Sequence, residues 1–287
     1  MMPSIAYWVD QLDPFLIHFT SRFGIRYYGL AYAAGFLIGA WLLGRYARAG
    51  RSLLPADKIG DFMVAAVMGV VLGGRIGSYL LYDGWRTFGS DPLAILRVWD
   101  GGMSFHGGLL GVVVAVAWFS RSSGIPLAHL WDLVASTAPA GLLLGRLANF
   151  WNGELWGRIS VVPWAVIFPR SMPPGTPLHM IPPRHPSQLY EAAMEGVLLL
   201  TYMQVRLWTS GVLRERPGRL AGEFLIGYAC VRIAGESFRE PDASLILGLS
   251  RGTFYSLFMI AVGLYLCLRR VPALPARGAQ PGPADTP

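Results

Sequence analysis

The sequence contains little charge, few cysteines and almost no lysine. Only 14% of its 287 residues are charged, whereas 53% are hydrophobic, and this balance excludes an ordinary soluble domain. The two cysteines, Cys230 and Cys267, lie within apolar runs and therefore predict neither a disulfide framework nor a zinc site. No other spacing of cysteine and histidine suggests a metal, so we expect a protein that uses no metal and no cofactor. The composition predicts a polytopic membrane protein.

Lysine is represented by Lys58 alone, and arginine supplies the other basic side chains of a chain with formal net charge +7. Arginine binds phosphate through a planar fork and keeps its charge, so this bias suits an anionic lipid as partner. A genome rich in G and C would produce the same bias. We expect no cleaved signal peptide, because Asp10, Asp13 and Pro14 interrupt the apolar residues of positions 1–26. An interfacial segment is expected there instead.

Apolar runs of helical length predict an all-α polytopic membrane protein with seven transmembrane helices. The predicted spans are 28–46, 62–82, 105–119, 130–145, 189–207, 224–238 and 254–268. The connection at 146–188 is rich in proline and too long for a simple turn, which predicts a small head outside the membrane. We expect one membrane-embedded domain at 1–271 and a disordered tail at 272–287.

The distribution of arginine assigns the two sides of the membrane. Seven spans place the termini on opposite sides, and arginines near the span ends of one side, such as Arg45, Arg121 and Arg206, place the N-terminus outside and the C-terminus in the cytoplasm. The outer side also holds arginines, listed here: Arg86, Arg97, Arg146, Arg158, Arg170, Arg184, Arg239 and Arg251. Because these depart from the positive-inside rule, the outer face is the candidate active face.

The stretch from Gly145 to Arg158 concentrates polar side chains at the end of the fourth predicted span. Polar groups at the mouth of a membrane segment are costly, so they indicate function. If its first turn is helical, Arg146 and Asn149 share one face, which suits an anionic headgroup. The alternative is an interfacial anchor of tryptophans and snorkelling arginines. An anchor does not need the two asparagines and the glutamate that this stretch also contains.

The sixth predicted span carries Arg232, Glu236 and Arg239 at helical spacing, with Tyr228 one turn earlier. Charges in an apolar helix must face a polar cavity or one another, so a functional stripe and an internal Arg–Glu pair both remain open. Arg75, inside the second span, is likewise either a structural charge or a ligand residue.

In the second span, Gly69–Gly73 and Gly73–Gly77 form two overlapping GxxxG spacings, which favour close helix packing.

His106 opens the third span and is followed by Gly107 and Gly108, which leave room for a substrate. A neutral imidazole accepts a proton at neutral pH, although a single interfacial histidine is more often structural. Ser187 is expected to be the N-cap of the fifth span, with Glu191 in its first turn. No nucleophile elbow is visible, so the nucleophile of a group transfer must arrive with a substrate.

These motifs resemble the bacterial prolipoprotein diacylglyceryl transferase family. The segment 145–157 resembles the family signature, and further similar motifs lie at 28–30, 73–77, 99–108, 184–191 and 232–242. They follow one another in order along nearly the whole chain. The departures are slight, because Ala148 stands where the signature usually has Gly, and Glu240 where Gln is common.

The resemblance implies a seven-helix enzyme of the bacterial inner membrane with a periplasmic head. Such an enzyme moves the diacylglyceryl group of phosphatidylglycerol to the lipobox cysteine of a preprolipoprotein, and it forms a thioether and releases glycerol 1-phosphate. Its partners would be phosphatidylglycerol, lipobox signal peptides and the bilayer, with no nucleic acid. The alternative is a non-catalytic transporter or scaffold for anionic phospholipids that uses the same arginines.

The resemblance also implies roles for single residues. Arg146 and Arg232 would bind the phosphate leaving group, and His106 would accept the thiol proton. The implied substrate-binding residues are Tyr28, Asn149, Glu154, Gly157, Tyr228, Glu236 and Arg239.

Overall fold

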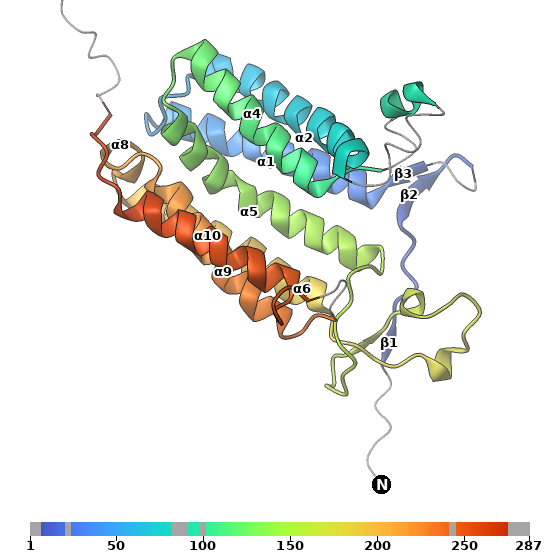
Figure 1. Cartoon of the computed structure of the whole chain (residues 1–287). Coiled ribbons are helices and arrows are strands. Elements are labelled where there is room, and N and C mark those ends of the chain that lie inside the picture. Colours follow the sequence, from blue (N-terminus) through green and yellow to red (C-terminus); the bar gives the residue numbers. More distant parts are fainter. Residues whose placement is uncertain (1–6, 21–23, 82–90, 98–101, 241–244, 275–287) are drawn as a thin grey trace, which may run out of the picture. The chain divides into compact units, whose positions relative to one another are not determined.

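The computed structural model describes residues 7–20, 24–81, 91–97, 102–240 and 245–274, and it is mostly helical (Figure 1). The helices are α1 (Tyr27–Arg48), α2 (Ile59–Leu81), α4 (Phe105–Ser123), α5 (Leu127–Trp151), α6 (Ser187–Glu191), α7 (Leu199–Thr209), α8 (Val212–Glu215), α9 (Arg219–Glu236) and α10 (Arg251–Leu268). A π-helical segment, Ala192–Leu198, joins α6 to α7. The predicted helical class is confirmed, although the all-α prediction omits the short strands described below.

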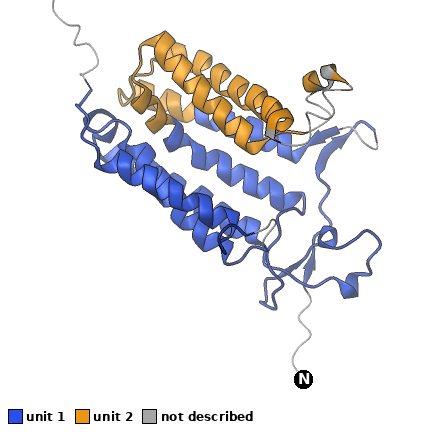
Figure 2. Cartoon of the chain, in the orientation of Figure 1, with its two compact units in different colours: residues 1–39, 134–274 blue, residues 40–133, 275–287 orange. Residues whose placement is uncertain are grey.

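The chain divides into two compact units (Figure 2). The first unit contains residues 1–39 and 134–274, and the second contains residues 40–133 and 275–287. Helices α1 and α5 contribute residues to both units. We describe each unit by itself, and the single domain expected at 1–271 stays a prediction.

In the second unit, α2 packs closely on α4 through glycines. Gly69 and Gly73 of α2 approach Gly107 and Gly111 of α4, and a Cβ at Gly111 would lie only 1.9 Å from the carbonyl oxygen of Gly69. Such small residues let helix backbones approach each other where side chains would hold them apart. The close packing predicted from the GxxxG spacings is confirmed.

The start of α4 is fixed by hydrogen bonds of Ser104 within the second unit. The Ser104 N–H donates to the carbonyl of Gly74 at 2.9 Å, and the Ser104 hydroxyl accepts the N–H of Gly107 as the N-cap of α4.

Arg75 is buried in the same unit and donates to the carbonyls of Ile95, Arg97 and Gly102. Its guanidinium carbon also lies 5.2 Å from the ring centroid of Tyr79. These contacts support the structural alternative for Arg75, because they hold the segment that leads into α4.

Five helices among the described residues are long and apolar enough to cross a membrane, namely Tyr27–Arg48, Ala56–Leu80, Phe105–Ser123, Leu127–Trp151 and Arg251–Leu268. The two other predicted spans, 189–207 and 224–238, also coincide with helical segments. The first of these is interrupted by the π-helical segment, and the second, α9, carries four charged side chains in 18 residues. The predicted number of seven spans therefore stays a prediction.

Several predicted span boundaries differ from the structure, and the fourth and sixth spans differ most. The fourth span was expected at 130–145, but α5 continues to Trp151. The first turn of the 145–158 stretch is therefore helical, and the irregular connection begins after Trp151. That this connection forms a head outside the membrane stays a prediction. The sixth span was expected at 224–238, but α9 begins at Arg219 and ends at Glu236.

The connection at residues 152–186 packs with N-terminal residues in the first unit. Strand β1 (Trp8–Val9) pairs in parallel with β4 (Val166–Ile167), while β2 (Phe15–His18) pairs with β3 (Gly24–Arg26) in an antiparallel hairpin. Burial raises the pKa of Asp10, which follows β1, although the Leu12 N–H and Arg170 oppose the shift. Part of the N-terminal segment therefore packs with this connection.

The tail expected at 272–287 is described only as far as residue 274. There the Leu274 N–H donates to the carbonyl of Arg214 at 2.8 Å, and residues 275–287 lie outside the described residues.

Candidate active site

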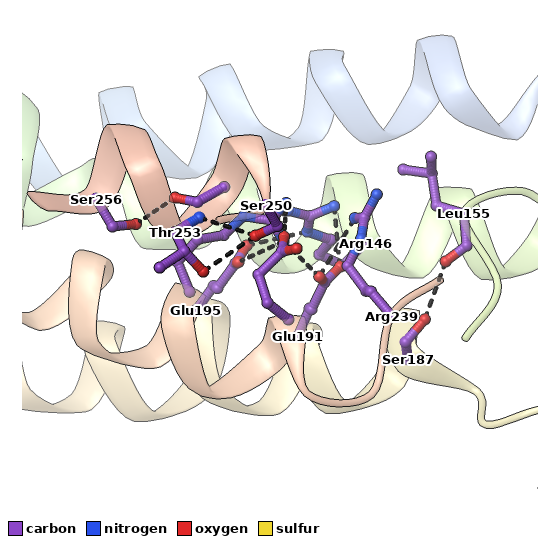
Figure 3. A network of polar contacts seen from close by, with 12 residues as sticks. Arg146, Leu155, Ser187, Glu191, Glu195, Arg239, Ser250, Thr253 and Ser256 are labelled. Atoms are coloured by element: carbon purple, nitrogen blue, oxygen red, sulfur yellow. Dashed lines mark hydrogen bonds and ion pairs between the residues drawn. The ribbon is translucent and has the colours of Figure 1, made fainter. Parts of the chain in front are cut away.

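A cluster of arginines and glutamates lies in the first unit where α5, α6, the π-helical segment and α9 meet (Figure 3). Helix α5 contributes Arg146, α6 ends with Glu191, and the π-helical segment contains Glu195. Glu195 is fully buried, and only 1% of the Glu191 side chain is exposed. Charges are stable at such depth only when they are paired.

Arg146 joins the two glutamates. Its Nη1 lies 3.0 Å from Glu191 Oε2, whereas its Nη2 lies 2.9 Å from Glu195 Oε2. Its Nε donates to the same Glu195 oxygen at 3.0 Å. One edge of the guanidinium is thus held by a single carboxylate oxygen.

Helix α9 brings a second arginine to the same place. Arg232 Nη1 donates to Glu191 Oε1 at 2.6 Å, and Arg232 Nη2 lies 2.6 Å from Glu236 Oε1. Arg239 Nη1 also donates to Glu191 Oε1, at 3.3 Å. Glu191 therefore contacts three arginines. With every group ionised, the three arginines and three glutamates of this cluster sum to zero charge.

The local backbone explains why these side chains meet. A π-helix is a rare departure from the α-helix that is often found at functional sites, and here it contains Glu195. Next to it, a Cβ at Gly196 would lie 2.6 Å from Leu143 Cβ, so α5 approaches this segment closely. In the first turn of α10, a Cβ at Gly252 would lie 2.3 Å from Glu236 Oε1. Glycine at that position leaves room for the glutamate.

Several predicted residues are brought together here, namely Arg146, Arg232, Glu236 and Arg239. Tyr228 of α9 lies within electrostatic range of Glu195 and Arg146. The internal Arg–Glu pair left open from the sequence is present, since Arg232 pairs with Glu236.

Arg239 does not lie on the helical stripe that was predicted for it together with Arg232 and Glu236. Because α9 ends at Glu236, Arg239 lies beyond the helix and forms a β-bridge with Gly157. Its side chain nevertheless reaches Glu191.

Asn149 and Glu154 follow Arg146 on the same stretch. The Asn149 side chain is buried. Glu154 is exposed and is held through its backbone, because its N–H donates to the carbonyl of Asn149 at 2.9 Å. The predicted helical face shared by Arg146 and Asn149 lies within α5.

Gly157 was expected to let a ligand approach. A Cβ at this position would lie 2.5 Å from the carbonyl oxygen of Phe238 and 2.7 Å from that of His185. The close approach that requires glycine here is therefore made by the protein backbone.

Ser187 was expected to be the N-cap of the fifth span, and this is wrong. The N-cap of α6 is Pro186, because Ser187 already has helical geometry and its hydroxyl donates to the carbonyl of Leu155 at 3.0 Å (Figure 3). Gln188 donates to the neighbouring carbonyl of Glu154. Both bonds hold a turn in which Leu155 has a φ of 55°, a strained conformation for a side chain of this size.

Tyr28 and His106 lie apart from the cluster along the chain. Tyr28, in the first turn of α1, accepts a hydrogen bond from Tyr32 at 3.3 Å between the two hydroxyl oxygens. His106 is exposed in the first turn of α4, and its ring centroid lies 5.8 Å from that of Phe105. It belongs to the second unit, which is described separately, so its role as a base stays a prediction. The motif residues 99–101, 241 and 242 lie outside the described residues.

Sequence reasoning missed Glu195 and gave Glu191 only a place in the first helical turn. A signal for both was available. They stand four residues apart, and an acidic residue within an apolar run needs a partner. Arginines in or beside the neighbouring predicted spans, such as Arg146 and Arg232, could supply that partner.

Comparison with known proteins identifies the family. A family model described as prolipoprotein diacylglyceryl transferase matches residues 14–269. The chain belongs to this family. Its sequence is 44% identical over 280 residues to the phosphatidylglycerol–prolipoprotein diacylglyceryl transferase of Bradyrhizobium diazoefficiens, which covers 93% of this chain and 94% of the relative. It is 45% identical over 276 residues to the protein of that name from Rhodospirillum rubrum, with coverages of 94% and 97%. The resemblance to prolipoprotein diacylglyceryl transferases is thereby confirmed.

Proposed function

We propose that this chain transfers the sn-1,2-diacylglyceryl group of phosphatidylglycerol to the cysteine thiol of a preprolipoprotein lipobox. The single observation that carries the proposal is the family match over residues 14–269, with relatives of that name along nearly the full chain. The reaction forms a thioether and releases sn-glycerol 1-phosphate. It is the first step of bacterial lipoprotein maturation.

The chemistry explains the residue types. The thiol loses its proton, its sulfur forms a bond to the glyceryl carbon, and the bond from that carbon to the phosphate oxygen breaks with its electron pair on the phosphate. A thiolate is the effective nucleophile, and His106 is our candidate for the proton acceptor. Negative charge grows on the phosphate as it leaves, and arginine forks stabilise that charge.

Arg146 and Arg232 are the arginines that we assign to the phosphate, with Arg239 in support. Glu236 orients Arg232, an assignment supported by the 2.6 Å contact between them. The buried Asn149 amide carries donors and an acceptor that suit a headgroup hydroxyl.

The remaining assignments are less direct. Glu154 orients the headgroup or an arginine, and Tyr28 and Tyr228 line the lipid site. Gly157 contributes by shaping the head, because its close neighbours are backbone atoms.

We further propose seven transmembrane spans in the bacterial inner membrane, with a periplasmic head, an external N-terminus and a cytoplasmic C-terminus. Two helical segments beyond the five apolar helices support the number seven. Their charges pair with one another inside the cluster, which lowers the cost of placing them in a bilayer. Lipid and signal peptide then enter laterally from the membrane.

The test compares Arg146→Lys and Arg232→Lys with the matched control Arg206→Lys. Arg206 lies on α7 and pairs with Glu223 of α9, which is not part of the cluster. Purified protein is incubated with phosphatidylglycerol and a lipobox peptide, and both products are measured. Lysine keeps the charge but not the fork, so each site variant should lose about tenfold to a hundredfold of activity while it stays folded. Full activity in both site variants would remove the bidentate mechanism. Lipid binding by folded wild-type protein without either product would favour a non-catalytic transporter or scaffold.

A further inference from the structure

The arginines assigned to the lipid phosphate already form ion pairs with carboxylates. Arg146, Arg232 and Arg239 all lie within ion-pair distance of Glu191, and Arg146 also contacts Glu195. Carboxylate and phosphate oxygens are recognised by the same guanidinium fork. A phosphate that enters this cluster therefore competes with a glutamate for the same N–H groups.

The two glutamates differ in how firmly they are held. Glu191 bridges three arginines, so its removal would take one ion-pair partner from each of them. Glu195 has one close partner, Arg146, which contacts only Oε2, whereas both oxygens of Glu191 lie within 3.0 Å of an arginine. Like Glu191 Oε2, Glu195 Oε1 is buried without a hydrogen bond to another described residue. The nearest arginine nitrogen on that side is Arg232 Nη1, at 3.9 Å. Glu195 is therefore the carboxylate that can exchange partners while the cluster stays assembled.

We propose that Glu195 is a positioning residue that takes the place of the phosphate as the partner of Arg146 and thereby speeds release of the glycerol phosphate product. This inference rests on the proposed function. Arginines that stabilise the leaving phosphate also bind the finished product, and tight product binding slows turnover. A carboxylate held beside Arg146 lowers the affinity for product, because it restores the pairing of the guanidinium when the anion departs.

The decisive variant is Glu195→Gln, which keeps the side-chain volume but removes the charge. We expect the inhibition constant of sn-glycerol 1-phosphate to fall about tenfold, because one charge-assisted pairing no longer competes. The KM for phosphatidylglycerol and kcat should fall together, since lipid binds more tightly and product leaves more slowly. A residue with only a structural role would lower activity without tightening product inhibition.

Glu223→Gln is the matched control. Glu223 also pairs with two arginines, Arg206 and Arg219, and is mostly buried, but it is not part of the cluster. Its substitution should leave the inhibition constant unchanged.

The outcomes separate the inference from the proposed function. If the wild-type protein lipidates no peptide, the proposed function fails before Glu195 is considered. If the wild type is active and a folded Glu195→Gln variant shows an unchanged inhibition constant, the inference is overturned.

A measurement on the wild type keeps the inference testable if that variant does not fold. Infrared difference spectra of protein labelled with ¹³C-glutamate should show a shifted carboxylate band when sn-glycerol 1-phosphate binds, because a glutamate loses its arginine partner. Product binding without a change in the carboxylate bands would overturn the inference.

Discussion

Replacing Gly73 by alanine tests the close packing of α2 on α4. A Cβ at this position would lie 2.4 Å from the carbonyl oxygen of Gly107 and 2.7 Å from Gly111 Cα. Carbon contacts are most favourable at about 3.5–4.0 Å, so the two helices must separate by roughly 1 Å. Both obstructing atoms belong to the backbone, and no side-chain rotation can relieve the clash.

The size of the effect follows from opposing contributions. Alanine has a helix propensity that is better than that of glycine by about 1 kcal/mol. Overpacking costs about 1–3 kcal/mol, and separation also weakens the neighbouring Cα–H···O contacts, each worth about 0.5–1 kcal/mol. We therefore expect a net loss of about 2 kcal/mol in the free energy of unfolding.

Gly60→Ala is the control on the same helix, because nothing lies within 4 Å of a Cβ at Gly60. Only the propensity term acts there, so this variant should be as stable as the wild type or more stable. Unfolding in mixed micelles with increasing denaturing detergent, followed by tryptophan fluorescence, measures both. If Gly73→Ala unfolds at the same detergent fraction as Gly60→Ala, the reasoning about this interface is wrong.

Two further predictions concern the N-cap of α4 and a close glycine contact in the first unit. Ser104→Ala removes the N-cap of α4 and should lower the free energy of unfolding by about 1 kcal/mol, measured in the same detergent titration, and Ser104→Asn should restore most of it. Gly157→Ala forces apart the backbones at His185 and Phe238, so it should lower both stability and peptide lipidation; an active variant of wild-type stability would show that the head tolerates this separation.

The sequence predicted the features that depend on short spacings. The glycines of α2 indicated a close helix contact, and the spacing of Arg232 and Glu236 placed both on one helical face, with an internal ion pair as one of two open alternatives. Both are decided within one or two turns of a single helix, where residue types and geometry are directly linked. The ordered motifs also identified the family.

Features that depend on tertiary contacts could not be predicted from the sequence. Gly145 suggested an end to the fourth span, yet α5 continues through Arg146 because the arginine finds acidic partners there. The π-helical segment cannot be predicted from a pattern of 3.6 residues per turn, and Glu195 was included in the predicted span 189–207 without use of its charge. Ser187 has the residue type of an N-cap, but the carbonyl of Leu155 takes its hydroxyl.

The pairing of charges between α9 and the segment before it has a consequence for biogenesis. A helix with four charged residues in 18 is a poor substrate for membrane insertion on its own, because each unpaired charge at the bilayer centre costs about 2.5–3.5 kcal/mol on a translocon scale. Glu191 precedes Arg232 in the chain and contacts it directly, and Arg146 is synthesised earlier still. If α9 crosses the membrane as proposed, we expect it to insert beside acidic partners that have already been synthesised, so that these helices enter the bilayer with their charges paired.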